Sequence, residues 1–410
     1  MSDFARVEEK VRAGERLGFE DGLALFLEPD VLRLGALANW VREQRHGDRT
    51  YFNVNMRFEA TNVCEASCSF CAFAKLEEGA PNAHTTTHEA AWRELAEFPD
   101  PRLSELHMVN GLHPTLPFEW YEELLRGWKR VRPNVHLKCF TGVEIHFFAQ
   151  KFGMTHEQVL TRLKAAGLGS LPGGGAEILH PDVRQRISTD KATGAEYLAA
   201  HRAAHKIGLP SNCTMLYGHI ETFEHRVDHL LQLRALQEET RGFQCFIPLA
   251  FHNENNSLRK LPEPTAIDSL RTLAAARLLL DNIDHVKAYW VSMGVATAQL
   301  GLRFGADDLD GTIVHESIYH SAGSRVPMEL SRDQLIRLIR EAGRIPVERD
   351  TTYGVIEELP RAPQPEAALK LRDRFAQKRA LSVVSESRRE GPATDNQRTS
   401  RGGAREWSDA

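Results

Sequence analysis

Short apolar runs alternate with amphipathic helical patterns from Tyr51 onward, and this alternation limits the chain to a small set of folds. Strand-like runs occupy eight segments, namely 54–60, 106–110, 135–140, 168–172, 212–216, 243–249, 286–292 and 309–313. Such alternation is typical of a parallel sheet built from βα units. The span 51–313 is close to the roughly 250 residues of a (β/α)8 barrel. We therefore predict an α/β fold with a TIM-type (β/α)8 barrel, and a doubly wound open sheet is the alternative.

The regions on either side of this alternation differ from it. Residues 1–50 carry leucines at helical intervals, which predicts an N-terminal helical cap. Residues 51–360 are expected to form the barrel and a helical extension at its C-terminal end. Within 361–410 we expect a short helix at 366–380 and then a disordered tail, because the polar stretch from 385 onward has too little apolar material to fold alone.

Two of the expected helices carry clear start signals. Thr155 with Gln158 matches a capping box, and that helix is predicted to end at Gly167. Ser331 with Gln334 repeats the pattern near the C-terminal end of the expected barrel.

Composition excludes several classes of function. Hydrophobic residues make up 42% of the chain and charged residues 26%, as in ordinary globular proteins. The formal net charge is −5 and no long basic block is present, so we expect small-molecule partners, with no nucleic acid and no membrane. The N-terminus has no continuous apolar stretch of the secretory kind, which indicates a cytoplasmic protein.

Three cysteines lie within eight residues, directly after the first predicted strand. In a reducing compartment the spacing of Cys64, Cys68 and Cys71 indicates metal binding, not disulfides. Clusters that only transfer electrons usually have four cysteine ligands, so three would leave one iron of a 4Fe-4S cluster open to a small molecule. Structural zinc is the alternative, and its fourth ligand would have to be His84 or His88. The other cysteines, at 139, 213 and 245, sit singly in predicted strands and are expected to be core residues.

Two turns that contain glycine follow other strand candidates. The first holds Asn110 and Gly111, and the second holds three glycines at 173–175 followed by Glu177. Glycines allow close backbone approach to a ligand, but the second turn lacks the Gly-Lys-Ser/Thr ending of a phosphate-binding loop. The alternative for Glu177 is a tight turn with a solvated carboxylate.

A histidine follows each of three predicted strands. His113, His219 and His252 are all expected at the strand ends that also carry the cysteine loop. We weigh substrate binding by these histidines about equally against ordinary loop packing.

The spacing Cys-x3-Cys-x-Phe-Cys resembles the signature of the radical-SAM superfamily. This resemblance implies that the open iron of a 4Fe-4S cluster chelates the amine and carboxylate of S-adenosyl-L-methionine (SAM). It also implies that Phe70 lies beside the adenine, that the turn at Asn110 and Gly111 contacts the methionyl group, and that Glu177 accepts hydrogen bonds from the ribose. Family members often have glycine where Asn110 stands.

Longer strings narrow the resemblance to one family. The chain is similar to the aminofutalosine synthases of the futalosine route to menaquinone over about 20–357, in the strings LHMVNGLHPTLPFEWYEELL, SLPGGGAEILHPDVRQRI, TMLYGHIET, RVDHLLQLRALQEETRGFQCFIPLAFHNENN and DDLDGTIVHESIYHSAG. The resemblance implies a transferase that adds the 5′-deoxyadenosyl radical of SAM to 3-[(1-carboxyvinyl)oxy]benzoate. The products would be 6-amino-6-deoxyfutalosine, methionine and bicarbonate.

The two carboxylates of that substrate would be bound by His113, His219 and His252, and a flavodoxin or ferredoxin would supply the electron. Two sibling activities remain open, those of dehypoxanthine futalosine cyclase and of F0 synthase. A non-catalytic iron-sulfur or zinc protein is the alternative of another class.

Overall fold

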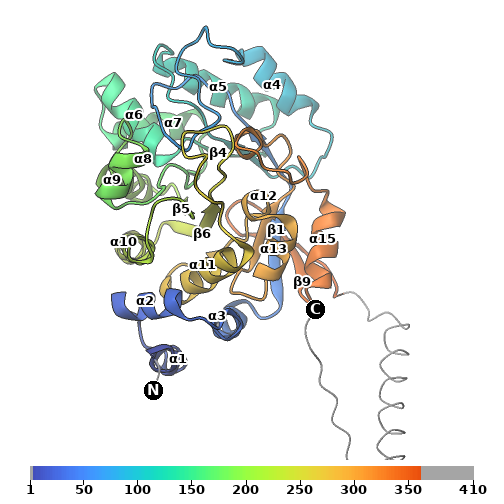
Figure 1. Ribbon diagram of the computed structural model, residues 1–410. Coiled ribbons are helices and arrows are strands. Elements are labelled where there is room, and N and C mark those ends of the chain that lie inside the picture. The colour runs from blue at the N-terminus through green and yellow to red at the C-terminus, as the bar shows by residue number, and fades with distance from the viewer. Residues whose placement is uncertain (1–2, 362–410) are drawn as a thin grey trace, which may run out of the picture. The chain divides into compact units, whose positions relative to one another are not determined.

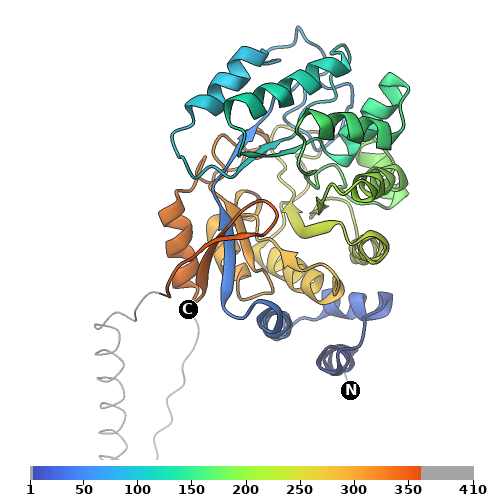
Figure 2. The same cartoon turned by 180° about the vertical axis from the view of Figure 1, so that it is seen from behind.

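The computed structural model describes residues 3–361, in which a ring of helices surrounds short, mostly parallel strands (Figures 1 and 2). The strands are β1 Arg49–Asn53, β2 Asn55–Phe58, β3 Glu105–Met108, β4 His136–Cys139, β5 Ser211–Tyr217, β6 Phe243–Ala250, β7 His285–Val286, β8 Asp308–Gly311, β9 Ile345–Arg349 and β10 Val355–Glu358. The helices are α1 Asp3–Ala13, α2 Phe19–Leu27, α3 Val31–His46, α4 His88–Glu97, α5 Phe118–Val131, α6 Gly142–Phe152, α7 His156–Ala166, α8 Pro181–Ile187, α9 Gly194–Lys206, α10 Phe223–Thr240, α11 Ala266–Leu279, α12 Trp290–Met293, α13 Val295–Gly301, α14 Ile318–Ser321 and α15 Arg332–Glu341. The predicted helix at 366–380 and the predicted tail lie outside the described residues.

The strands form three small sheets, not one continuous sheet. Their orders are β10-β9-β1-β8, β2-β3-β4 and β5-β6-β7, and every pair is parallel except β9 with β10. Isolated parallel bridges join a strand residue to a residue outside the named strands, at Met56 with Val314, Lys138 with Ser170, Ser211 with Leu171, and Asp308 with Lys287. The parallel α/β class is confirmed, whereas the strands of a complete barrel are not all present as continuous ladders.

Two predicted strands were wrong in extent. Segment 168–172 contributes only the bridges of Ser170 and Leu171. In segment 286–292, β7 ends at Val286 and α12 begins at Trp290. The Trp290 indole is buried and donates from Nε1 to the Gly311 carbonyl, at 3.0 Å. A short apolar run does not by itself distinguish a buried strand from a buried helical turn.

The start signals read from the sequence are confirmed. The Thr155 hydroxyl accepts from the Gln158 amide, and α7 ends at Ala166 with Gly167 as its C-cap, whose φ of 118° suits a residue without a Cβ. The Ser331 hydroxyl likewise accepts from the Gln334 amide at the start of α15. These signals work because they depend on residues close in sequence.

The first three helices precede β1 and pack outside the strands, beside α10 and α11 (Figure 1). Gly22 of α2 allows this approach, because a Cβ there would lie 2.7 Å from Val227 of α10 and 3.3 Å from Leu279 of α11. None of the described helices is long and apolar enough to cross a membrane.

Candidate active site

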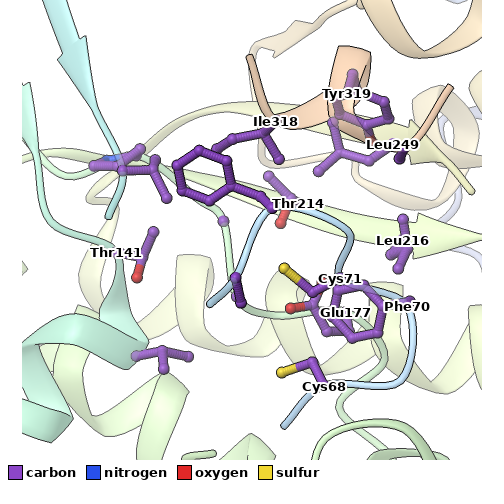
Figure 3. Close-up of a pocket in the computed structure, with 18 of the residues that line it drawn as sticks. Cys68, Phe70, Cys71, Thr141, Glu177, Thr214, Leu216, Leu249, Ile318 and Tyr319 are labelled. Carbon is purple, nitrogen blue, oxygen red and sulfur yellow. The ribbon is translucent and has the colours of Figure 1, made fainter. Parts of the chain in front are cut away.

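The cysteine loop opens on a cavity of about 270 Å³, which we call the main cavity. Cys64, Cys68 and Cys71 all line it, and Figure 3 shows the sulfur atoms of Cys68 and Cys71 pointing to the same side. Backbone hydrogen bonds anchor the loop, from Cys64 N to the Lys75 carbonyl at 2.8 Å and from Ser69 N to the Ile187 carbonyl at 2.9 Å. Three thiols are therefore held at one cavity wall by main-chain contacts.

The main cavity offers three cysteines and no fourth one. Cys139, Cys213 and Cys245 are fully buried in strands and do not line the cavity, in agreement with their expected core role. The donor set therefore fits a 4Fe-4S cluster with one iron left free for a small molecule.

Neither histidine that was considered as a fourth zinc ligand lines the main cavity. His84 Nε2 lies 3.3 Å from the Glu59 carbonyl. The His88 ring stacks between Trp92 and Trp120. These contacts leave the zinc alternative without its fourth ligand.

A buried cation stands beside the cysteines. Lys191 Nζ lies 2.7 Å from Glu177 Oε1 and 5.5 Å from the Phe70 ring centroid. Burial raises the pKa of the Cys68 thiol to about 12 in the metal-free chain, and the Lys191 charge opposes this rise. A bound metal cation deprotonates a coordinating thiol outright, so Lys191 and the metal would act in the same direction.

The first glycine turn connects the cysteine loop to its neighbours. A Cβ on Gly111 would lie 2.2 Å from the Val63 carbonyl oxygen, so only glycine fits there. Asn110 Oδ1 accepts from the Ala60 amide at 2.8 Å, and Asn110 Nδ2 donates to Glu144 Oε1 at 3.2 Å. Asn110 and Gly111 both line the main cavity, as predicted. The Asn110 side chain uses its amide group to hydrogen-bond the neighbouring segments.

The second glycine turn brings Glu177 to the same cavity. A Cβ on Gly173 would lie 2.8 Å from the Cys213 backbone, which accounts for a glycine at this crossing. Glu177 has a left-handed φ of 46° and is buried, which excludes the alternative of a solvated carboxylate. Burial disfavours its charge, but Lys191 outweighs that effect and lowers the pKa of Glu177. Phe70 lies next to Glu177 in Figure 3.

Of the three predicted histidines, the structure brings only His252 to the main cavity. His113 is buried, and its Nδ1 accepts from the amides of Thr115 and Leu116, both at 3.3 Å. The enclosed ring of His219 lies with Nε2 3.1 Å from the Leu216 carbonyl. A histidine side chain that follows a strand can hydrogen-bond to its own loop or face a cavity, and the sequence alone does not distinguish these two positions.

Several cavity residues were missed by sequence reasoning. They are Arg57, Glu59, His107, Lys191, Tyr289, Glu316 and Tyr319. Arg57 and Glu59 belong to a polar alternation with Asn55 in the first strand run, and this period of two was the available signal. Lys191 follows a helix with no strand before it, so nothing local indicated its position.

A second group of possible metal ligands lies apart from the main cavity. His46, His285 and Asp307 place their ligand atoms within 4.8 Å of one another. However, Arg277 already pairs with the Asp307 carboxylate, and His46 Nε2 lies 2.9 Å from the Asp284 carbonyl oxygen. This group is accounted for as a buried ion-pair cluster.

Comparison with known proteins places this geometry in a family. Residues 58–233 match the radical SAM superfamily, and residues 240–362 match the CofH/MqnC C-terminal region. The chain is 46% identical over 363 residues to the aminodeoxyfutalosine synthase of Streptomyces coelicolor, covering 86% of this chain and 94% of that one. A second aminodeoxyfutalosine synthase, from Thermus thermophilus, is also 46% identical over 353 residues, or 85% and 94% of the two chains. This chain belongs to the aminodeoxyfutalosine synthase family of radical-SAM enzymes.

This chain is also similar to more distant relatives among known sequences and structures. A 5-amino-6-(D-ribitylamino)uracil–L-tyrosine 4-hydroxyphenyl transferase from Methanothermobacter thermautotrophicus is 38% identical over 335 residues, or 80% of this chain and 91% of that one. The [FeFe]-hydrogenase maturase HydG has the same fold, with a TM-score of 0.67, 16% identity and coverage of 84% and 76%. Methylornithine synthase follows, with a TM-score of 0.61, 16% identity and coverage of 82% and 95%. The radical-SAM resemblance of the sequence is confirmed, and the family implies a 4Fe-4S cluster and SAM.

Proposed function

We propose that the protein converts SAM and 3-[(1-carboxyvinyl)oxy]benzoate to 6-amino-6-deoxyfutalosine, methionine and bicarbonate, with water as co-reactant. The observation that carries this proposal is the opening of three cysteines, and no fourth, on one largely apolar cavity. Supporting it is the 46% identity to two aminodeoxyfutalosine synthases. A flavodoxin or ferredoxin is the proposed electron donor.

Cys64, Cys68 and Cys71 would hold the 4Fe-4S cluster, which supplies the electron that cleaves SAM into methionine and the 5′-deoxyadenosyl radical. Lys191 pairs with Glu177, and its charge would also favour a thiolate at Cys68. The backbone at Asn110 and Gly111 and the 173–175 turn would receive the methionyl part, with Phe70 beside the adenine and Glu177 toward the ribose. This assignment is supported by their common cavity.

Apolar side chains would protect the radical. Leu216, Leu249 and Ile318 lie around the labelled cysteines in Figure 3 and line the main cavity. Apolar walls would limit the access of bulk water to the radical and hold the vinyl group against the adenosyl carbon. His252 remains a proposed contact for the second substrate, whereas His113 and His219 are left out because they do not line the main cavity.

We also propose that the strands complete a (β/α)8 ring. The four isolated parallel bridges support this, because they link neighbouring sheets at the positions where a barrel needs continuity. The ring would place the cysteine loop, both glycine turns and His252 at one end.

The test is anaerobic reconstitution with iron and sulfide, followed by SAM, dithionite and the carboxyvinyloxybenzoate, with mass spectrometry of the products. The proposal expects an adenosyl adduct with the mass of aminodeoxyfutalosine. Free 5′-deoxyadenosine without an adduct would instead favour a sibling activity, which the 38% identity to the hydroxyphenyl transferase keeps as the second candidate. Triple replacement of the cysteines by alanine is the control and should abolish both products.

A further inference from the structure

Arg57 is a buried cation at the main cavity with most of its hydrogen-bonding capacity unused. It extends from β2, its exposed fraction is 7%, and it lines the cavity. Within residues 3–361, the Arg57 side chain makes one hydrogen bond, from Nη2 to Asp310 Oδ2 at 3.0 Å. Its Nε is buried and has no partner within that part of the chain. The guanidinium carbon lies 5.6 Å from the Tyr289 ring centroid. A guanidinium offers five N–H donors, so several are left for a ligand.

Arg57 shares its carboxylate partner with a second buried cation. Asp310 is shared by two cations, because its Oδ1 accepts from Lys287 Nζ at 2.9 Å while Oδ2 accepts from Arg57. The neighbouring carboxylate of Glu105 is taken by Lys138, at 2.7 Å. One carboxylate therefore serves two buried cations, and a buried charge without a full partner is costly.

Within residues 3–361, no other titratable group hydrogen-bonds to or forms an ion pair with the Arg57 side chain. Glu316 has its own partner, His320 Nδ1 at 2.9 Å, and this hydrogen bond raises the pKa of His320. Burial raises the pKa of Glu59 to about 8, so this group is mostly neutral at pH 7. Burial also lowers the pKa of His107 to about 3, so its ring is uncharged.

Among residues 3–361, the only other lysine or arginine that lines the main cavity is Lys191, which is already paired with Glu177. The remaining wall is largely apolar, and includes Val109, Ile247 and Leu249. A cavity with one underused guanidinium in an apolar wall matches a carboxylate attached to an aryl or vinyl body.

We propose that Arg57 binds a carboxylate of the second substrate, the one that is not SAM, and thereby orients it in the main cavity. This inference rests on the proposed function for the identity of the substrate. The carboxylate would accept from the free donors of the guanidinium while Asp310 holds the opposite side of the same group. Asp310 and Lys287 are then positioning residues, because they act on the substrate through Arg57.

The experiment measures substrate binding separately from turnover. Holoenzyme is reconstituted anaerobically for the wild type, Arg57→Gln and Arg57→Lys, with Arg202→Gln as a control for loss of an exposed arginine that pairs with Glu239. Calorimetry without reductant then gives the affinity for 3-[(1-carboxyvinyl)oxy]benzoate and for its two monomethyl esters. A separate titration gives the affinity for SAM.

We expect Arg57→Gln to weaken binding of the diacid by about tenfold to a hundredfold, as for hydrogen bonds to a charged group. Affinity for SAM and iron content should not change, and Arg57→Lys should lie between the other two. One of the two monoesters should bind the wild type more weakly than the diacid does. Arg57→Gln should weaken binding of that monoester little further, because the carboxylate that the ester blocks is the one that the guanidinium would bind.

The proposal is overturned if the wild type, Arg57→Gln and Arg57→Lys bind the diacid with equal affinity. It is also overturned if, for both esters, the loss of affinity from esterification and the loss from Arg57→Gln are additive. If Arg57→Gln does not fold, Arg57→Lys and the wild-type esters decide: the proposal falls if the wild type binds both esters as tightly as the diacid. A wild type that binds the diacid through Arg57 but forms no adenosyl adduct would refute the proposed function alone.

Discussion

Lys191 Nζ lies 2.7 Å from Glu177 Oε1, at the wall that carries the cysteines, and the two side chains are only 12% and 8% exposed. The two residues are fourteen positions apart in the chain, with helix α8 between them. Lys191 places a positive charge beside Cys68 and offsets the effect of the Glu177 carboxylate, whose charge disfavours the Cys68 thiolate.

Replacing Lys191 by methionine is expected to weaken retention of the cluster. The change leaves Glu177 unpaired and deprives the Cys68 thiolate of a neighbouring cation, and even 1.4 kcal/mol of lost attraction is about a tenfold change in affinity. Iron per chain after a timed chelator challenge measures this. The exposed Lys260→Met is the control, and identical iron loss from both variants would contradict the role of Lys191.

Gly111→Ala should destabilise the cysteine loop. The added Cβ would lie 2.2 Å from the Val63 carbonyl, which is backbone and has no rotamer to relieve the clash. We expect a loss of about 1–3 kcal/mol in the free energy of unfolding, measured by urea denaturation of the metal-free chain. Gly79→Ala has open space around its Cβ and should change stability by less than about 0.5 kcal/mol. Equal effects of the two substitutions would argue against this close approach.

Removing the lysine of the buried Glu105–Lys138 ion pair should cost more stability than removing the lysine of an exposed ion pair with the same N–O distance. Both Glu105–Lys138 and Glu157–Lys206 are 2.7 Å apart, but the first side chains are 1% exposed and the second are 47% and 68% exposed. Lys138→Met should lower the free energy of unfolding by roughly 3–5 kcal/mol, because it leaves a buried carboxylate alone. Lys206→Met should cost less than about 1 kcal/mol.

Adding Glu105→Gln to Lys138→Met tests the cause of that loss. The double variant should recover part of the lost stability, since no unpaired charge remains. Strictly additive losses in a double-mutant cycle would mean that the two residues act independently.

Stability should fall as the pH rises through the titration range of Glu59. Burial raises its pKa to about 8, from about 4.5 in an unfolded chain. Between these values the folded protein keeps a proton that the unfolded chain releases, so the free energy of unfolding decreases by up to about 1.4 kcal/mol per pH unit.

Glu59→Gln should remove this dependence, because the amide oxygen can still accept from Ser317 Oγ, which lies 2.8 Å from Glu59 Oε2. The advantage of Glu59→Gln over the wild type should therefore grow from pH 5 to 8 in urea denaturation of the metal-free chain. The exposed Glu97→Gln serves as the control. A difference that does not change with pH would show that Glu59 titrates normally.

Local patterns predicted the parts of this protein that depend on neighbours in sequence. The capping boxes at Thr155 and Ser331, the glycine at the end of α7 and the cysteine spacing all follow from residues a few positions apart. The same holds for the three cysteines as a group, since one short loop carries all of them to the main cavity. The amino-acid sequence alone therefore determined the α/β class, the clustered thiols and the family resemblance.

Tertiary structure decided which polar side chains meet at those thiols. His252 lines the main cavity whereas His113 and His219 do not, although all three follow strands and all three rings contact backbone groups. Lys191 joins Glu177 only after α8 folds back, and Arg57 becomes a cavity cation only where Asp310 of β8 meets β2. These contacts depend on packing between distant segments, and the energy of a buried charge depends on every group around it.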